Sequence, residues 1–247
     1  MYMDRVGTSV EEEVSSELSQ ARILITGLTG NSGVDVARSF ADLNVRLVVH
    51  TADLSPELVE LFAFLSQSAS EIRLHTLDIS TANAAAHFAQ TSAQAFGGLD
   101  AAINLTSVSS AEIDAIHDDA DLEALIEAKL APLAQLTRVI ANRMCVVMSE
   151  GLVLNVVNMP EPRDARSSAV AGLVRTALAS MIAQESREWA NKGIRINGVG
   201  PRAFFDGSSS GAYLATEPDI ASLALHLASR RGRSFSGHVF DSCGSGF

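Results

Sequence analysis

The amino-acid sequence predicts an α/β fold: one domain built on a doubly wound parallel sheet of about seven strands, with helices on both faces. Short β-branched runs alternate with windows rich in Ala and Leu over residues 21–247. Hydrophobic residues make up 47% of the chain and aromatic residues 5%, which is typical of an aliphatic core between a parallel sheet and its helices. The expected strands are RILITG, VRLVVH, IRLHTLD, LDAAINL, LVLNVVN, IRINGV and HVFDS.

Residues 1–20 precede this domain as an acidic extension. A capping-box pattern begins at Thr8, and Val10, Val14 and Leu18 recur every fourth residue. These patterns predict either a short amphipathic helix or a partly disordered tail. The extension is too acidic for a signal or transit peptide.

Charge and cysteine content exclude several classes of function. The formal net charge is −11, and the only lysines are Lys129 and Lys192, which argues against nucleic acid or an anionic membrane as a partner. Cys145 and Cys243 lie far apart without a metal-ligand or CxxC spacing, so we expect a cytoplasmic protein with no metal site. No segment approaches the roughly 20 apolar residues of a membrane-spanning helix.

The first expected strand runs into TGLTGNSGVDVARSF, a glycine-bearing turn followed by a helix. Such a turn brings backbone N–H groups and the positive end of a helix dipole together, where a dinucleotide pyrophosphate binds in many α/β folds. Further motifs follow along the chain. They are HTLDIS with Asp78, LDAAINL with Asn104, GLVLNVV, GLVRTALASMIAQESREWANKGIRINGVGP and EPDIASLALHLAS.

Together these motifs resemble the short-chain dehydrogenase/reductase family over essentially the whole of residues 21–247. The resemblance implies a single Rossmann-type domain and hydride transfer between NAD or NADP and an alcohol or carbonyl carbon. It also implies assembly into dimers or tetramers.

The resemblance assigns cofactor-binding positions, with departures from the family pattern. Asn31 replaces the middle glycine of TGxxxGxG, and Leu105 replaces the second asparagine of NNAG. Asp78 resembles the family's adenine-contacting acid, or is a turn residue at a strand end. Thr51 stands at the ribose-reading place, where neither the carboxylate typical of NAD nor the arginine typical of NADP is present. The assigned positions are Gly27, Asn31, Gly33, Thr51, Asp78, Asn104 and Pro201.

The family's chemistry needs a serine, a tyrosine, a lysine and an asparagine, and all four positions are substituted in this sequence. Counting back from the helical GL motif places Arg163 at the tyrosine position and Ser167 at the lysine position. Asn158 stands at the serine position and Lys129 at the asparagine position. An arginine stays protonated in proteins, so Arg163 cannot exchange the proton that carbonyl reduction requires.

Two interpretations of the substituted cations stay open. Lys129, Arg163 and Arg202 converge on the vacated pocket and form an anion site, or each of them pairs with a local acid such as Asp164 or Asp206. The second interpretation is the favoured one, because charge pairs at the edge of a site are usually solvated structure.

The helix after Arg163 has a body of small residues, and in the family the corresponding helix helps to build the main subunit interface. The small residues are Ser168, Ala171, Gly172, Ala179 and Ser180. We therefore expect a non-catalytic, regulatory or structural subunit that assembles with itself or with an active relative. One alternative is an NAD(P)-dependent oxidoreductase of alcohols or ketones, similar to 3-oxoacyl reductases, with a site rebuilt around Asn158, Lys129 and Tyr213. The other alternative is a nucleotide-binding sensor without turnover.

Overall fold

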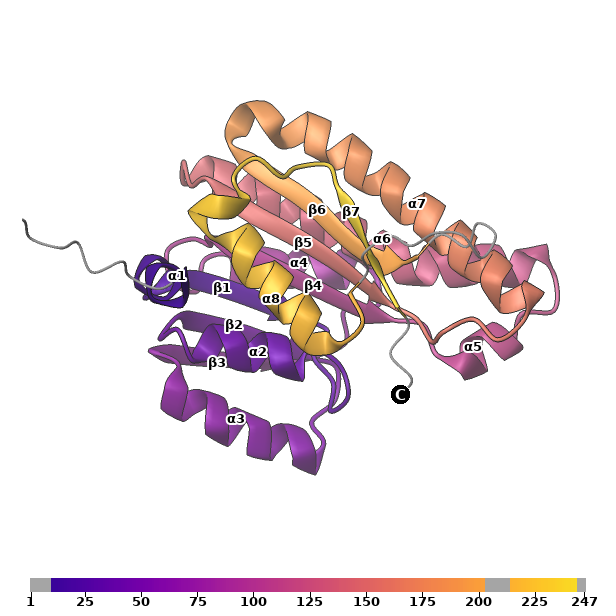
Figure 1. Cartoon of the computed structure of the whole chain (residues 1–247), viewed down its shortest axis with the longest axis horizontal. Coiled ribbons are helices and arrows are strands. Elements are labelled where there is room, and N and C mark those ends of the chain that lie inside the picture. The colour runs from indigo at the N-terminus through magenta and orange to yellow at the C-terminus, as the bar shows by residue number, and fades with distance from the viewer. Residues whose placement is uncertain (1–9, 203–213, 244–247) are drawn as a thin grey trace, which may run out of the picture.

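The computed structural model describes residues 10–202 and 214–243. At its centre lies a seven-stranded, all-parallel sheet in the order β3-β2-β1-β4-β5-β6-β7 (Figure 1). Each predicted strand segment overlaps one of these strands, so the predicted doubly wound α/β fold is confirmed. The strands are β1 (Arg22–Thr26), β2 (Arg46–Thr51), β3 (Glu71–Thr76), β4 (Ala101–Ser107), β5 (Gly151–Asn158), β6 (Ile194–Pro201) and β7 (Val239–Ser242).

Helices cover both faces of the sheet and enclose two aliphatic cores. One core lies under α1, α2, α3 and α8, and the other lies under α4, α6 and α7. The helices are α1 (Val10–Leu18), α2 (Val34–Ala41), α3 (Pro56–Ser68), α4 (Ala82–Ser92), α5 (Ser110–Asp114), α6 (Asp119–Val146), α7 (Ala165–Trp189) and α8 (Glu217–Ala228), with short 3-10 turns at Ala190–Lys192 and Arg230–Gly232. In the described part of the chain, no helix is both long enough and apolar enough to cross a membrane.

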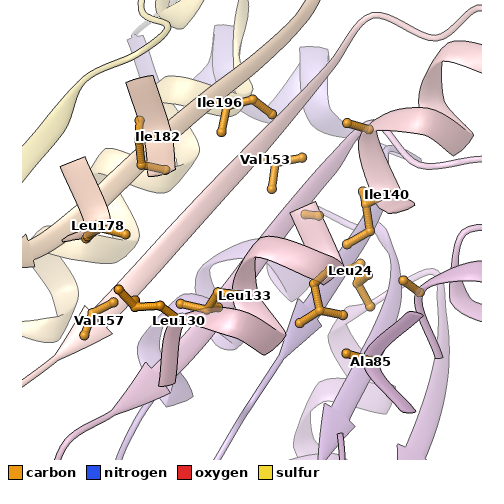
Figure 2. Packing of buried hydrophobic residues seen from close by; sticks show 14 of the residues in the cluster. Leu24, Ala85, Leu130, Leu133, Ile140, Val153, Val157, Leu178, Ile182 and Ile196 are labelled. Carbon is orange, nitrogen blue, oxygen red and sulfur yellow. The ribbon is translucent and has the colours of Figure 1, made fainter. Parts of the chain in front are cut away.

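The core under α6 and α7 is built from branched aliphatic side chains, as the composition predicts. Figure 2 shows Val153 and Ile196 of the central strands beside Ile140 of α6 and Ile182 of α7, and all four side chains are fully buried. Strands buried on both faces read as continuous apolar runs. β5 accordingly has no exposed residue along its length.

The N-terminal extension forms a helix, α1, which packs against the rest of the domain. Leu18 is buried and Val14 partly buried in the core under α2 and α8. The Glu17 carboxylate accepts a hydrogen bond of 2.6 Å from the backbone N–H of Arg230. Residues 10–18 of the extension are therefore helical, and Thr8 lies outside the described residues.

The turn from β1 into α2 is pressed against the carboxyl end of β4. Gly27 has a φ of 74°, and a Cβ atom there would lie 2.1 Å from the Leu105 carbonyl oxygen. Gly33 has a φ of 88°, and its Cβ would lie 2.3 Å from a Leu105 side-chain carbon. Both positions therefore require glycine, for conformation as well as for space.

We predict that Gly27→Ala lowers the free energy of unfolding by about 2–4 kcal/mol, because the side chain meets both a left-handed backbone and the β4 carbonyl. Gly172→Ala in α7 is the matched control, since a Cβ there meets nothing within 4 Å. That change should raise stability by about 0.5–1 kcal/mol. Urea denaturation of both variants checks the prediction, and equal effects would contradict it.

Candidate functional site

A cleft opens at the carboxyl ends of the strands, where the strand order reverses between β1 and β4. Open α/β sheets bind ligands at this switch point. Two hollows form the cleft and share Thr29 and Ser107. The β2-side hollow, of about 360 Å³, is lined by residues that include Gly27, His50, Asp78 and Lys129. The β5-side hollow, of about 410 Å³, is lined by residues that include Asn31, Ser32, Ser109 and Asn158.

A chain of buried polar side chains ties the central strands together beneath the cleft. The Thr26 hydroxyl donates to Oδ1 of Asn104 at 3.2 Å, and Nδ2 of Asn104 donates to Oδ1 of Asn155 at 3.0 Å. The Thr137 hydroxyl of α6 donates to the same Asn155 oxygen at 3.0 Å. All four side chains are buried. Asn104 thus lies beneath the cleft, as the sequence predicts, but its side chain is committed to neighbouring strands.

His50, at the end of β2, joins the glycine turn to the end of β3. Its Nδ1 accepts the Gly27 N–H at 3.1 Å, so Nε2 carries the proton and donates to the Leu77 carbonyl at 2.8 Å. Burial is the largest influence and lowers the pKa of His50, with help from the nearby His75, against the opposing effects of the Leu77 hydrogen bond and Asp78. The imidazole is therefore held neutral.

Asp78 and Thr51 lie near each other but differ in access to the cleft. Asp78 lines the β2-side hollow and accepts hydrogen bonds from the N–H and hydroxyl of Ser80, which lower the pKa of its carboxyl. Asp78 is therefore a turn residue that accepts hydrogen bonds from Ser80, and it also lines the hollow, so this turn role does not conflict with the predicted contact to an adenine. Thr51 is buried and its hydroxyl donates to the Asp53 carbonyl at 2.6 Å. The neighbouring Ala52 lines the hollow instead.

The N-terminus of α2 is covered by a carboxylate from α8. Gly33 is the N-cap residue of α2 and provides no side-chain cap. Instead, Oε1 of Glu217 accepts the backbone N–H of Asp35 at 2.8 Å. Burial, the largest influence, and the neighbouring Asp35 raise the pKa of Glu217, although the backbone N–H groups that it faces act in the opposite direction.

Asn158 and Lys129, which the sequence resemblance assigns to catalytic positions, are both engaged with other side chains. Nδ2 of Asn158 donates to the Ser32 hydroxyl at 2.8 Å and so ties the end of β5 to the glycine turn. Nζ of Lys129 lies 2.7 Å from a carboxylate oxygen of Glu112, in the first turn of α5. Pro132, one turn further along α6, has no N–H to donate to the Ala128 carbonyl, and both residues line the β2-side hollow.

Arg163 and Ser167 lie at the start of α7, where a capping box sets the helix boundary. The Asp164 carboxylate accepts the Ser167 N–H at 2.7 Å, and the Ser167 hydroxyl accepts the Asp164 N–H at 3.1 Å. Arg163 precedes the helix and is exposed. The two positions are therefore not stacked on one helical turn, as a tyrosine and lysine four residues apart would be.

The three cations proposed for an anion site do not line one hollow. Lys129 lines the β2-side hollow, whereas Arg163 lines a separate recess of about 100 Å³ beside Glu161. Arg202, which follows the buried Pro201, has its guanidinium 3.9 Å from a carboxylate oxygen of Glu161. The local-acid interpretation accounts for Lys129 and Arg202, with Glu112 and Glu161 as the acids. Asp206 and Tyr213 lie outside the described residues.

Sequence reasoning missed three residues that shape this cleft: His50, Glu112 and Glu217. A histidine at a strand end, such as His50, has no distinctive sequence pattern. Glu217 contacts a residue 182 positions away, which no local motif reveals. Among the described residues, no group of three or more His, Cys, Asp or Glu side chains could hold a metal ion.

Comparison with known proteins identifies the family of this chain. The family model described as short chain dehydrogenase matches residues 21–207. No curated protein shows a significant sequence match to the chain.

Solved structures share the fold at low sequence identity. A short-chain type dehydrogenase/reductase from Mycobacterium marinum superimposes with a TM-score of 0.75 at 15% identity, over 95% of this chain and 97% of that chain. An NADH-dependent reductase complexed with NAD gives 0.73 at 18% identity, over 94% and 98% of the two chains. A metagenomic short-chain oxidoreductase in complex with NADP gives 0.71 at 22% identity, over 93% and 100%.

We predict a pH dependence of stability that originates in His50. Its pKa in the folded protein lies below the unfolded value of about 6.5, so its contribution is complete above that pH and is lost as the pH falls toward the folded pKa. His50→Asn keeps an acceptor for the Gly27 N–H without an ionisable ring. Urea midpoints between about pH 4 and 7 should fall less steeply for this variant. Parallel curves for the two proteins would contradict the prediction.

Proposed function

Because the chain belongs to the short-chain dehydrogenase family, we propose that it is a non-catalytic member, a regulatory or structural subunit that assembles with itself or with an active relative. The observation that carries the proposal is the start of α7. In place of a tyrosine and a lysine, it has the exposed Arg163 and a Ser167 occupied in a capping box. Within residues 165–189, α7 contains neither tyrosine nor lysine.

This arrangement removes the proton chemistry of carbonyl reduction. A general acid must release and recover a proton near neutral pH, and an arginine does not. The Ser167 hydroxyl has no neighbouring ammonium to shift its ionisation, since the two lysines of the chain are Lys129, paired with Glu112, and Lys192, stacked on Trp189. The Asn158 amide in turn donates a hydrogen bond to the Ser32 hydroxyl.

The residues present fit only part of an NAD or NADP molecule. The β2-side hollow, with Asp78 and Ala52 at its edge, has a volume suited to a nucleoside. The diphosphate end does not fit, because the Glu217 carboxylate lies at the α2 N-terminus that would receive it. When bound, such a dinucleotide would supply or accept the hydride. The proposed role does not need that exchange.

The outer face of α7 supports the assembly part of the proposal. Leu173 is 46% exposed, and it lines a recess of about 320 Å³ together with Ile116 and Leu122. Gly172 leaves open space beside it. Ala171, predicted to belong to this interface stripe, is fully buried in the core instead, because it faces the sheet. The remaining small residues of the stripe are Ser168, Gly172, Ala179 and Ser180.

We also propose a cytoplasmic location, without nucleic-acid or membrane partners. The proposal rests on the acidic charge and on Cys145 and Cys243, which are both free thiols.

We predict that the purified chain does not oxidise NADH or NADPH in the presence of a panel of ketones and aldehydes. The missing general acid alone should lower the rate by about 10²–10⁴-fold relative to an active relative assayed in parallel. Absorbance of the reduced nicotinamide measures the rate. Saturable, enzyme-dependent turnover would refute the non-catalytic role and favour the rebuilt oxidoreductase.

We further predict that Leu173→Glu disrupts assembly, because it places a carboxylate in the apolar part of the proposed α7 interface. Val59→Glu in α3 is the matched control, since Val59 is 51% exposed on a helix outside this interface. Light scattering after size exclusion should show a smaller species only for Leu173→Glu. An unchanged mass for both variants would exclude this face from the assembly.

A further inference from the structure

We propose that Glu217 is a built-in block of the cleft: its carboxylate occupies the N-terminus of α2 in place of a dinucleotide pyrophosphate and so keeps NAD(H) and NADP(H) out. The proposal goes beyond the missing catalytic residues, because it concerns binding rather than proton transfer. It rests on the contact, on the rigidity of its support, on local charge and on the space available.

The contact uses the groups that a phosphate would use. Helix N-termini bind anions through free backbone N–H groups and the helix dipole. Here Glu217 accepts the Asp35 N–H at 2.8 Å, and backbone hydrogen bonding from Val36 and Gly33 also favours the ionised carboxylate. The anion position of α2 is therefore filled by the chain itself.

The support of Glu217 is rigid. It is the first residue of α8, and the Asp219 carboxylate fixes that helix end by accepting the N–H groups of Ala215 and Thr216 at 3.0 and 2.9 Å. α8 packs along α2 on the same face of the sheet, as Figure 1 shows. Behind Glu217, the buried Ile220 and Ala221 anchor α8 in the core. A ligand thus cannot displace the carboxylate without moving a packed helix or rotating the side chain away.

Charge at this end of α2 opposes a phosphate. Asp35 lies in the first turn of α2 and interacts unfavourably with the Glu217 carboxylate, which burial also makes harder to ionise. A pyrophosphate would add further negative charge beside both groups. Like charges in a partly buried site disfavour one another strongly, because the local dielectric is low.

The recess that Glu217 shares with the end of β5 is small. Glu217 and Asn158 line a recess of about 10 Å³, enough for about one water molecule. The hydrogen bond between Asn158 and Ser32 bridges the glycine turn and β5 nearby.

A purely structural role for Glu217, as a helix cap supplied from another helix, makes a different prediction. Glu217→Gln keeps an amide oxygen that can accept the Asp35 N–H, so the variant should fold in either case. If capping were its only role, the change would alter thermal stability without any gain in cofactor affinity.

The test is a titration of wild type, Glu217→Gln and Glu57→Gln with NADH and with NADPH, followed by nicotinamide fluorescence. Glu57 is the matched control because its side chain is exposed and its Cβ lies close to the glycine turn, 4.0 Å from a Cβ built at Gly30. Both variants therefore remove one negative charge near the turn, and only Glu217→Gln removes it from the α2 N-terminus. Thermal unfolding of all three proteins verifies that each is folded.

We expect Glu217→Gln to bind at least one of the two dinucleotides about tenfold or more tightly than wild type, and Glu57→Gln to gain about threefold at most. Equal gains in both variants would overturn the proposal, as would wild-type binding as tight as that of Glu217→Gln. Failure of all three proteins to bind would overturn it as well, because another feature would then exclude the dinucleotide.

The outcome also separates this proposal from the non-catalytic role. Binding by Glu217→Gln without turnover leaves both standing. Binding with turnover by the same variant leaves the block standing and removes the non-catalytic role, since the rest of the site would then be competent.

Discussion

The close approach of the β1–α2 turn to the carboxyl end of β4 is the constraint on which the cleft depends. Gly27 leaves no space for a side chain against the Leu105 carbonyl, and Gly33 leaves none against the Leu105 side chain. The turn therefore packs directly against Leu105, at a position where the family has a polar residue. His50 holds the same turn from the β2 side through the Gly27 N–H.

This constraint fixes where α2 begins and therefore where its free N–H groups point. The electrostatic preference of that helix end for an anion exists whether or not a ligand is present. In this chain the anion is the Glu217 carboxylate, which accepts the Asp35 N–H. Glu217 belongs to α8, a helix that packs on the same face of the sheet as α2. The buried chain from Thr26 to Asn104, Asn155 and Thr137 keeps the strands below in register.

The fold was predictable from sequence because it depends on local periodicity. Each apolar, β-branched run became a strand, and motif spacing placed Asp78 and Asn104 at the carboxyl edge of the sheet, beside the cleft. The site was less predictable because its decisive contacts join distant segments. Glu112 of α5 forms an ion pair with Lys129 of α6. Glu217 of α8 accepts a hydrogen bond from Asp35, which lies 182 positions earlier in the chain.

Some errors came from local rules that were applied incompletely. The four-residue spacing of Arg163 and Ser167 suggests a shared helical turn, but Asp164 and Ser167 form a capping box that starts the helix after Arg163. The orientation of Ala171 follows from helical period, since it lies one residue from the buried Val170 and three from the buried Val174. A small residue on a helix does not by itself identify an interface, because cores use small residues too.

The two features that oppose dinucleotide chemistry arise on opposite faces of the sheet. The start of α7 belongs to the layer formed with α4 and α6, whereas Glu217 and the α2 N-terminus belong to the layer formed with α3. No single packing change could therefore produce both. The capping box at the start of α7 does not explain a carboxylate at the α2 N-terminus, and that carboxylate does not explain the capping box. The proposed non-catalytic role accounts for both, since a subunit that transfers no hydride needs neither the proton donor nor the phosphate site. The glycine turn and the aliphatic cores would remain necessary in such a subunit, because they hold the sheet and the outer face of α7 that the proposal assigns to assembly.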